Sequence, residues 1–212
     1  RGFDIGTDKV PLAERRGIPH HLIDIADPTA PSEVGRWWLP GQRKGDAESI
    51  VRHEHIDFAF RVHHTLSYPE RPDRAYLGYI DGGVVILDIS DPSHPRQVSR
   101  LDYHPPFPGF THTVVPLFER GLLLVADEAT TVSDGEDWPK RYWIADVREE
   151  TNPMLISSFP IPEDFQQLHE EGGRIGAHNI HENDPEPGSA RLQNTCVATW
   201  FSAGLRIYDI RD

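Results

Sequence analysis

The decapeptide Ile86-Leu-Asp-Ile-Ser-Asp-Pro-Ser-His-Pro95 recurs along this 212-residue chain. An earlier copy reads Leu22-Ile-Asp-Ile-Ala-Asp-Pro-Thr-Ala-Pro31, and a degenerate copy reads Ile144-Ala-Asp-Val-Arg-Glu-Glu-Thr-Asn-Pro153. A fourth copy begins at Ile207-Tyr-Asp-Ile-Arg-Asp212. The aspartate that the copies share lies at residues 24, 88, 146 and 209, at intervals of 64, 58 and 63 residues. The sequence therefore repeats with a period of about sixty residues, which is typical of a repeat architecture.

Each copy predicts two strands joined by a tight turn. Val84-Val-Ile-Leu-Asp-Ile89 is rich in β-branched residues and too short for a typical helix. Asp-Pro followed by a polar residue favours a turn that the Asp side chain itself can cap. A second hairpin precedes the phrase, because Arg74-Ala-Tyr-Leu-Gly-Tyr-Ile80 turns at Asp81-Gly-Gly83. Each repeat therefore holds roughly four strands, which is the content of one β-propeller blade.

The repeats predict an all-β fold: an incomplete β-propeller of about three and a half four-stranded blades with a short irregular N-terminal leader. A β-sandwich of the same strands is the alternative, but a sandwich does not predict periodic copies of one phrase. Closed propellers have about four to eight blades, so we expect missing blades or a partner chain to complete the ring. The chain begins at Arg1 instead of Met, and we interpret it as a fragment whose compartment is unknown.

The composition excludes several classes of protein. The chain has 17 Gly and 19 Pro, which argues against a helical bundle and for short strands joined by turns. The single cysteine, Cys196, cannot form an internal disulfide and excludes a Cys-rich zinc module. No apolar run approaches the roughly 18 residues that a membrane helix needs. The net charge of −13 argues against a nucleic-acid partner for the propeller part, because attraction to phosphate needs clustered Lys and Arg.

From about residue 24 to residue 212 the sequence resembles the LVIVD-repeat β-propeller proteins of bacteria. The segments that carry the resemblance are Val85-Ile-Leu-Asp-Ile-Ser-Asp-Pro92, Gly35-Arg-Trp-Trp-Leu-Pro-Gly41, Thr111-His-Thr-Val-Val115, Val125-Ala-Asp-Glu-Ala129 and Ala177-His-Asn-Ile-His-Glu-Asn183. Members of this family largely lack an assigned activity. The resemblance therefore implies a propeller with a binding or scaffold role, whose channel takes a small molecule or a protein.

Residues 1–29 resemble a different family, the tRNA dimethylallyltransferases, which transfer a prenyl group to an adenosine next to the anticodon. The similar segments are Arg1-Gly-Phe-Asp-Ile-Gly-Thr-Asp-Lys9 and Gly17-Ile-Pro-His-His-Leu-Ile-Asp-Ile-Ala-Asp-Pro-Thr29. The Gly-rich phosphate-binding loop of that family is missing. The two patterns overlap at Asp24-Ile-Ala-Asp-Pro-Thr29, as a gene fusion or a sequence-assembly error would leave them. We therefore divide the chain into a transferase-like leader, residues 1–29, and a propeller fragment, residues 30–212.

One histidine precedes the first strand of each predicted blade, in His64-Thr-Leu66, His112-Thr-Val114 and His178-Asn-Ile180. The first strand of a propeller blade lines the central channel, so these imidazoles are expected to converge near one end of that channel. Imidazole suits zinc, copper and iron. The predicted metal ligands are His64, His112, His178, His181 and Glu182. His63, Asp127 and Glu128 are candidates for further ligands or for acceptors that orient an imidazole N–H.

Other interpretations stay open at this point. The histidines can be structural groups that bind the backbone of a neighbouring blade, or they can line a site for a small molecule. A metal-dependent oxidase is a narrower form of the metal hypothesis, and tRNA prenylation is the function that residues 1–29 imply. Whether the protein is an enzyme is undecided, and its catalytic residues are unknown.

The remaining polar groups predict simpler roles. His20-His21 is expected in a loop, and His53-Glu-His55 is expected on a solvated edge strand. Ser133-Asp-Gly-Glu-Asp137 lacks the ligand spacing of an EF-hand and is expected to be an exposed acidic turn. Cys196 lies in an apolar strand, which predicts a core residue and not a nucleophile.

Overall fold

The computed structural model describes residues 3–4, 24–25, 32–47, 60–107, 109–130, 139–184 and 186–211. The chain divides into two compact units, Arg1–Arg36 and Trp37–Asp212. In the first unit, β1 (Phe3–Asp4) pairs antiparallel with β2 (Asp24–Ile25). The predicted boundary between residues 29 and 30 lies outside the described residues.

The first four-stranded sheet of the second unit follows the predicted pattern of strands and turns. It consists of β3 (Phe60–Tyr68), β4 (Arg71–Ile80), β5 (Val84–Asp88) and β6 (Arg96–Leu101), which pair antiparallel in this order. Gly83 in the turn before β5 has a φ of 79°, which suits glycine. In the turn before β6, the Asp88 carboxylate accepts a hydrogen bond from the Ser90 N–H at 2.9 Å. Asp91 accepts one from the Ser93 N–H at 3.0 Å, so both Asp side chains cap this turn.

The second four-stranded sheet repeats this arrangement. It consists of β7 (Thr111–Leu117), β8 (Leu122–Asp127), β9 (Tyr142–Asp146) and β10 (Met154–Ser158). A short 3₁₀ turn, Phe118–Arg120, joins β7 to β8 and ends at Gly121, whose φ is 62°. In the turn between β9 and β10, Glu149 replaces Asp as the capping residue and accepts a hydrogen bond from the Thr151 N–H at 3.4 Å.

A third sheet begins in the same way. The strands β11 (Thr195–Thr199) and β12 (Leu205–Asp209) form an antiparallel hairpin. The segment 177–181 lies beside β11, because the His181 N–H donates to the Val197 carbonyl and the Thr199 N–H donates to the Asn179 carbonyl, both at 2.9 Å. A short helix, α1 (Phe165–Glu170), lies in the connection from β10 to this sheet.

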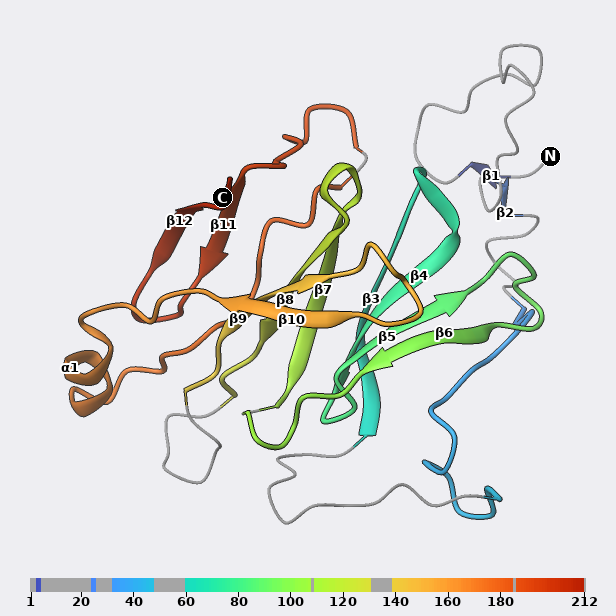
Figure 1. Cartoon of the computed structure of the whole chain (residues 1–212), viewed down its shortest axis with the longest axis horizontal. Helices are drawn as coiled ribbons and strands as arrows, with labels where there is room; N and C mark the ends of the chain where they lie inside the picture. The colour runs from blue at the N-terminus through green and yellow to red at the C-terminus, as the bar shows by residue number, and fades with distance from the viewer. Residues whose placement is uncertain are drawn as a thin grey trace. The chain divides into compact units, whose positions relative to one another are not determined.

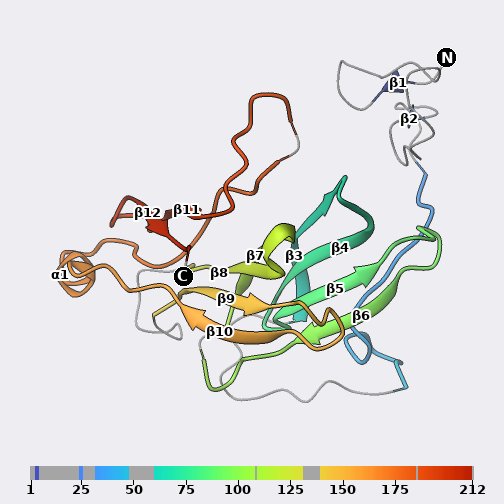
Figure 2. The same cartoon turned by 45° about the horizontal axis from the view of Figure 1, so that its top comes forward.

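The strands of the first two sheets join in one curled sheet with the order β10-β9-β8-β7-β4-β5-β6, and β3 pairs with β4 (Figures 1 and 2). The strand pairing that joins the two halves, between β4 and β7, consists of one residue pair among the described residues, Ile80 with Thr111. The second unit is therefore all-β, as the repeats predict, and its sheet curls like half a barrel.

Apolar side chains fill the spaces between successive sheets. Alternation along β5 sends Val84 and Ile86 to one face and Val85 and Leu87 to the other, and none of the four is more than 6% exposed. The first face packs with residues of β7, β8 and β9, and the second with residues of β3, β4 and the segment 37–39. A further cluster lies between the opposite face of the second sheet and the third sheet. Successive sheets are thus stacked face to face.

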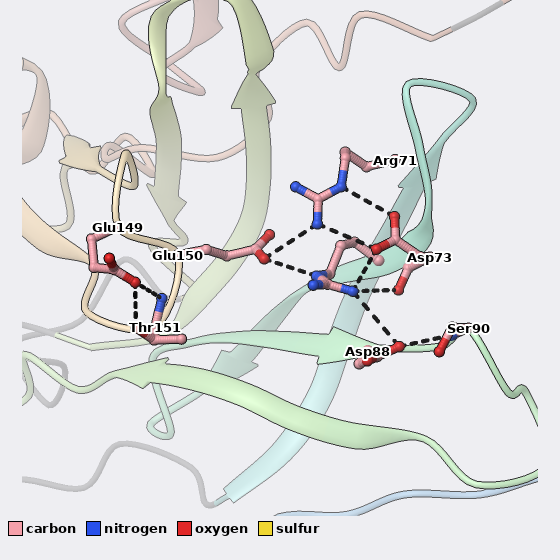
Figure 3. A network of polar contacts seen from close by, with 8 residues as sticks. Arg71, Asp73, Asp88, Ser90, Glu149, Glu150 and Thr151 are labelled. Carbon is pink, nitrogen blue, oxygen red and sulfur yellow. Dashed lines mark hydrogen bonds and ion pairs between the residues drawn. The ribbon is translucent and has the colours of Figure 1, made fainter.

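Charged residues tie the first two sheets together at one end (Figure 3). Arg74 on β4 donates from Nε to Glu150 Oε2 at 2.9 Å and from Nη1 to Asp73 Oδ2 at 2.6 Å. Arg71 also donates to Glu150 Oε2, at 3.3 Å. The side chains of Arg74 and Glu150 are 16% and 21% exposed. Because Glu150 lies in the turn between β9 and β10, this partly buried network spans both sheets.

The thiol of Cys196 is expected to be unreactive in the folded protein. The residue is 2% exposed, and burial raises its pKa to about 12. At about pH 8 the native protein should therefore react with a thiol reagent at least about 100-fold more slowly than the protein denatured in guanidinium chloride. The absorbance of the released thiol product measures both rates. Equal rates would contradict the placement of Cys196 in the core.

Gly78 on β4 allows the close approach of β7. A Cβ at this position would lie 2.0 Å from the His112 carbonyl oxygen and 2.9 Å from that of Thr111. Since such overlap forces the backbone to shift, we expect Gly78→Ala to lower the free energy of unfolding by about 1–3 kcal/mol in urea denaturation. Thr65→Ala, at an exposed position of β3, is the control and should change it by about 0.5 kcal/mol or less. Equal effects of the two substitutions would refute the close approach.

Candidate metal centre

The three histidines at equivalent positions of the repeats lie together. His64 is on β3, His112 is on β7, and His178 is in the segment beside β11. The ring centroids of His64 and His112 are 5.7 Å apart, and those of His112 and His178 are 4.9 Å apart. The stacking of successive sheets therefore brings together residues that are far apart in the sequence.

The carboxylate of Glu128 lies among these rings. Glu128 directly follows β8, and its N–H donates to the carbonyl of Phe110 at 2.9 Å. Its Oε1 is 3.5 Å from His178 Nε2, and its Oε2 is 3.7 Å from His112 Nε2. The side chain is 12% exposed. A carboxylate with little access to water thus faces imidazoles from two different sheets.

His63 completes a compact group of donor atoms. Its ring centroid lies 4.4 Å from that of His112, and its Nε2 lies 3.9 Å from Glu128 Oε2. One donor atom each from His63, His112 and Glu128 lie within 4.8 Å of one another. Neighbours on a regular strand face opposite sides, but the pairing of β3 with β4 is irregular between Phe60 and His64. This irregularity allows both His63 and His64 to face the site.

We call His63, His64, His112, His178 and Glu128 the histidine cluster. Glu182 borders it, with Oε1 at 3.4 Å from His64 Nε2. His181 instead places its Nε2 at 2.7 Å from the carbonyl oxygen of Ala190. Residues i and i+3 of an extended segment face opposite sides, which agrees with the different contacts of His178 and His181. Asp127 is fully buried, and its carboxylate accepts hydrogen bonds from Tyr103 and Trp143.

Arg174 and Phe201 also border the histidine cluster, although no sequence pattern indicated them. Arg174 donates from Nη2 to Glu128 Oε1 at 2.8 Å and from Nε to the carbonyl of Ala129 at 2.7 Å. The Phe201 ring stacks on His178 with centroids 4.6 Å apart, and the Arg174 guanidinium lies 3.8 Å from the Phe201 ring centroid. Both residues lie outside the repeated phrase, so no periodic signal marks them.

Burial and crowding keep the His112 imidazole neutral. Its pKa is lowered to about 3, first because burial removes water and then because His63, His178 and His64 repel an additional positive charge. Burial also lowers the pKa of His178, against the opposing effect of Glu128. Burial raises the pKa of the Glu182 carboxyl group, which His64 opposes. A neutral imidazole retains a lone pair that can bind a metal ion.

The donor atoms of the cluster suit a first-row transition metal. Imidazole nitrogens combined with a carboxylate oxygen are ligands that zinc and iron share. His112 Nδ1 hydrogen-bonds with Thr113 Oγ1, and such a contact orients the ring so that Nε2 faces Glu128. His64 Nδ1 is buried and has no hydrogen-bond partner among the described residues. Ligand atoms at about 2 Å from one ion are at most about 4 Å apart. His63 Nε2 and His112 Nε2 lie 3.9 Å and 3.7 Å from Glu128 Oε2, within this limit. The donor atoms of the two histidines lie within 4.8 Å of each other and need to approach by about 1 Å at most.

Several sequence candidates lie outside the described residues. These are His20, His21, His53, His55 and the acidic segment 133–137. Within the part of the chain that the structure describes, His63, His112 and Glu128 are the one group of three potential ligands whose donor atoms lie within 4.8 Å of one another.

Two families match separate parts of the chain. Residues 73–102, which include β5, β6 and the turn between them, match the LVIVD repeat. Residues 1–52 match the IPP transferase family, and this match extends beyond the predicted leader of residues 1–29. In the part of the chain with described structure, the helices are too short or too polar to cross a membrane.

Curated relatives resemble the N-terminal part of the chain. The tRNA dimethylallyltransferase of Frankia casuarinae is 56% identical over 43 residues, which are 20% of this chain and 15% of that protein. The enzyme of the same name from Solibacter usitatus is 65% identical over 37 residues, 18% of this chain and 12% of the relative. The tRNA dimethylallyltransferase of Thermomicrobium roseum is 79% identical over 28 residues, which are 13% of this chain and 8% of that protein. The chain thus spans at most 15% of the length of these three relatives.

The lowered pKa of His112 predicts that stability depends on pH. The unfolded chain binds a proton at His112 below the ordinary value of 6.5, whereas the folded chain binds it only near pH 3. Between these pH values the unfolded state holds the additional proton, so the free energy of unfolding falls as the pH falls. This group contributes up to about 1.4 kcal/mol per pH unit to that slope.

Urea denaturation of the metal-free protein between about pH 7 and about pH 5 measures this slope. His112→Gln should flatten it, whereas Thr65→Ala, at an exposed position of β3 without a titratable group, should leave it unchanged. Identical slopes for the wild type and His112→Gln would show that His112 titrates normally in the folded protein.

Proposed function

We propose that the second unit is a propeller-type binding module whose histidine cluster holds one transition-metal ion. The observation that carries this proposal is the compact group of donor atoms from His63, His112 and Glu128. His63 belongs to the first sheet, while His112 and Glu128 belong to the second. A bound ion would therefore also cross-link successive repeats. The match of residues 73–102 to the LVIVD repeat supports the binding-module part of the proposal.

Each residue of the cluster has a role in this proposal. Nε2 of His63, Nε2 of His112 and Oε2 of Glu128 are the ligand atoms, since the two nitrogens lie 3.9 Å and 3.7 Å from that oxygen. Arg174, which donates to Glu128 Oε1, holds the carboxylate so that Oε2 stays directed at the ion. A bound ion would polarise a small molecule at its open position or lower the pKa of a bound water.

The other predicted ligands take supporting roles. His64 and His178 flank His112 and offer further nitrogens at the edge of the group. Glu182 contacts His64 and orients that imidazole. His181 contacts the Ala190 carbonyl and is not included in the proposed ligand set.

Three alternatives compete with this proposal. Structural histidines would also explain contacts across successive sheets, and in that case the propeller would bind its ligand or protein partner without a metal. A tRNA-prenylating activity rests on the similarity of residues 1–52 to the IPP transferase family. A metal-dependent oxidase requires that the bound ion be redox-active, as copper and iron are.

Elemental analysis of the full chain, purified with its affinity tag removed, tests the metal proposal. We expect about one equivalent of zinc, copper or iron per chain. Glu128→Gln and His112→Gln each remove a ligand and should weaken binding of added Co²⁺ by at least about 10- to 100-fold. The controls Glu119→Gln and His94→Gln, both at exposed residues outside the cluster, should bind like the wild type.

Absence of stoichiometric metal, together with no binding of added Co²⁺ or Zn²⁺ by the wild type, would favour the structural histidines. Equal binding by Glu128→Gln and the controls would exclude Glu128 as a ligand. If the ion is copper or iron, oxygen consumption with candidate reductants separates the oxidase from a binding module. Zinc would exclude the oxidase.

A further inference from the structure

A chain of buried hydrogen bonds lies directly behind the proposed ligands. The Tyr103 hydroxyl donates to Asp127 Oδ1 at 2.5 Å and also lies 2.6 Å from Thr111 Oγ1. Because the single Tyr103 proton is engaged by Asp127, the Thr111 hydroxyl is the donor in the second contact. Thr111 and Asp127 are 0% exposed, and Tyr103 is 5% exposed. Water therefore does not compete for these bonds.

Trp143, on the strand β9 that pairs with β8, is the last member of this hydrogen-bonded chain. Its Nε1–H donates to Asp127 Oδ2 at 2.6 Å, and Trp143 on β9 is 5% exposed. Both oxygens of the Asp127 carboxylate are thus bound, one by Tyr103 and the other by Trp143. The carboxylate is held in one orientation by two buried donors.

The bonded residues are the immediate neighbours of two proposed ligands. Thr111 precedes His112, and Asp127 precedes Glu128. Thr111 and Asp127 are also partners in the pairing of β7 with β8. The Tyr103 hydroxyl therefore connects the two strands at the point where each presents a ligand.

His112 lies at an irregularity in this pairing. Thr111 pairs with Asp127 and Thr113 pairs with Ala126, so His112 is the additional residue on β7. A β-bulge of this kind redirects the side chain of its additional residue and is frequent next to functional sites. A bulge is also a place where the backbone can shift, so the direction of the His112 ring depends on what holds Thr111.

We propose that Tyr103, Thr111 and Trp143, acting through Asp127, are positioning residues that hold His112 and Glu128 at the separation a metal ion requires. This inference rests on the proposed function, because it concerns the same site. None of these four residues belongs to the proposed ligand set. Groups hydrogen-bonded directly to a ligand typically change metal affinity by about 10- to 100-fold, and residues that act through the backbone of a ligand's neighbour should have a smaller effect.

Variants that remove one hydroxyl and change little else provide the test. Tyr103→Phe removes the tyrosine hydroxyl and Thr111→Val removes the threonine hydroxyl, whereas Thr111→Ser keeps a hydroxyl at residue 111. Tyr79→Phe is the matched control, because the buried Tyr79 hydroxyl also has two partners, Leu39 N–H and Gln42. Each full-length protein is titrated with Co²⁺, whose visible absorption spectrum reports the geometry of its ligands.

We expect Tyr103→Phe and Thr111→Val to bind Co²⁺ about 3- to 10-fold more weakly, which is less than the loss of a direct partner of a ligand would cause, and with a changed absorption spectrum. Thr111→Ser and Tyr79→Phe should retain the affinity and the spectrum of the wild type. A purely structural role would lower thermal stability in Tyr103→Phe as in Tyr79→Phe and leave the spectrum of the bound Co²⁺ unchanged.

An unchanged spectrum and affinity in Tyr103→Phe, with the wild type binding Co²⁺, would overturn the positioning role and leave the metal site intact. If the wild type binds no metal, the proposed function and the positioning role both fail. A loss of affinity in Thr111→Ser equal to that in Thr111→Val would also overturn the inference, because the hydroxyl would then be irrelevant.

Discussion

Burial of both faces of the inner strands in the first two sheets is the constraint on which the histidine cluster depends. Val84 and Val85 are neighbours on β5, point in opposite directions, and are both fully buried. A strand with two buried faces needs a layer of apolar residues on each side, so successive sheets must stack. Stacking places the middle of β3, the start of β7 and the segment 177–181 next to one another. The convergence of His64, His112 and His178 is a result of this packing.

The charge balance of the histidine cluster is set by the neighbours of one carboxylate, Glu128. A carboxylate with little access to water is costly unless a cation or several hydrogen-bond donors accompany it. Around Glu128 the cation is Arg174, at 2.8 Å, while the neighbouring His112 stays neutral because its pKa is far below the ordinary range. Glu128 therefore presents Oε1, which is paired with the Arg174 guanidinium, and Oε2, which faces the neutral His112 ring at 3.7 Å. The second oxygen is where an additional positive charge is most stabilised.

The sequence predicted the parts of this arrangement that repeat. The phrase at residues 86–95 located β5, β6 and the turn between them, and equivalent positions in three repeats identified His64, His112 and His178. The strands and the turn were predictable because strand alternation and turn chemistry are local properties. The site also includes residues without a periodic signal, such as Arg174 and Phe201, which come close only through the packing of the third sheet.

The irregular register of the strand pairs also could not be predicted from the sequence. The proximity of His63 to the cluster depends on an irregularity in the pairing of β3 with β4, and the direction of His112 depends on one in the pairing of β7 with β8. Strict alternation would place His63 and His64 on opposite faces. Irregular register arises from the contacts between strands, so a single strand read alone does not reveal it. Tyr103 and Trp143 were missed for the same reason, since their common partner, Asp127, lies on a different strand.

In the turns between the last two strands of a sheet, a side chain of the turn accepts a hydrogen bond from the backbone of the same turn, and this affects how the repeats diverge in sequence. Asp91 accepts a hydrogen bond from the Ser93 N–H, and Glu149 accepts one from the Thr151 N–H at the equivalent turn. A turn that supplies its own acceptor does not depend on the rest of the sheet for its closure, so an Asp-Pro turn and a Glu-Glu turn both join paired strands. Mutation can therefore remove the sequence similarity of a repeat while its backbone structure is kept. The repeats of this chain are thus more similar in structure than in sequence.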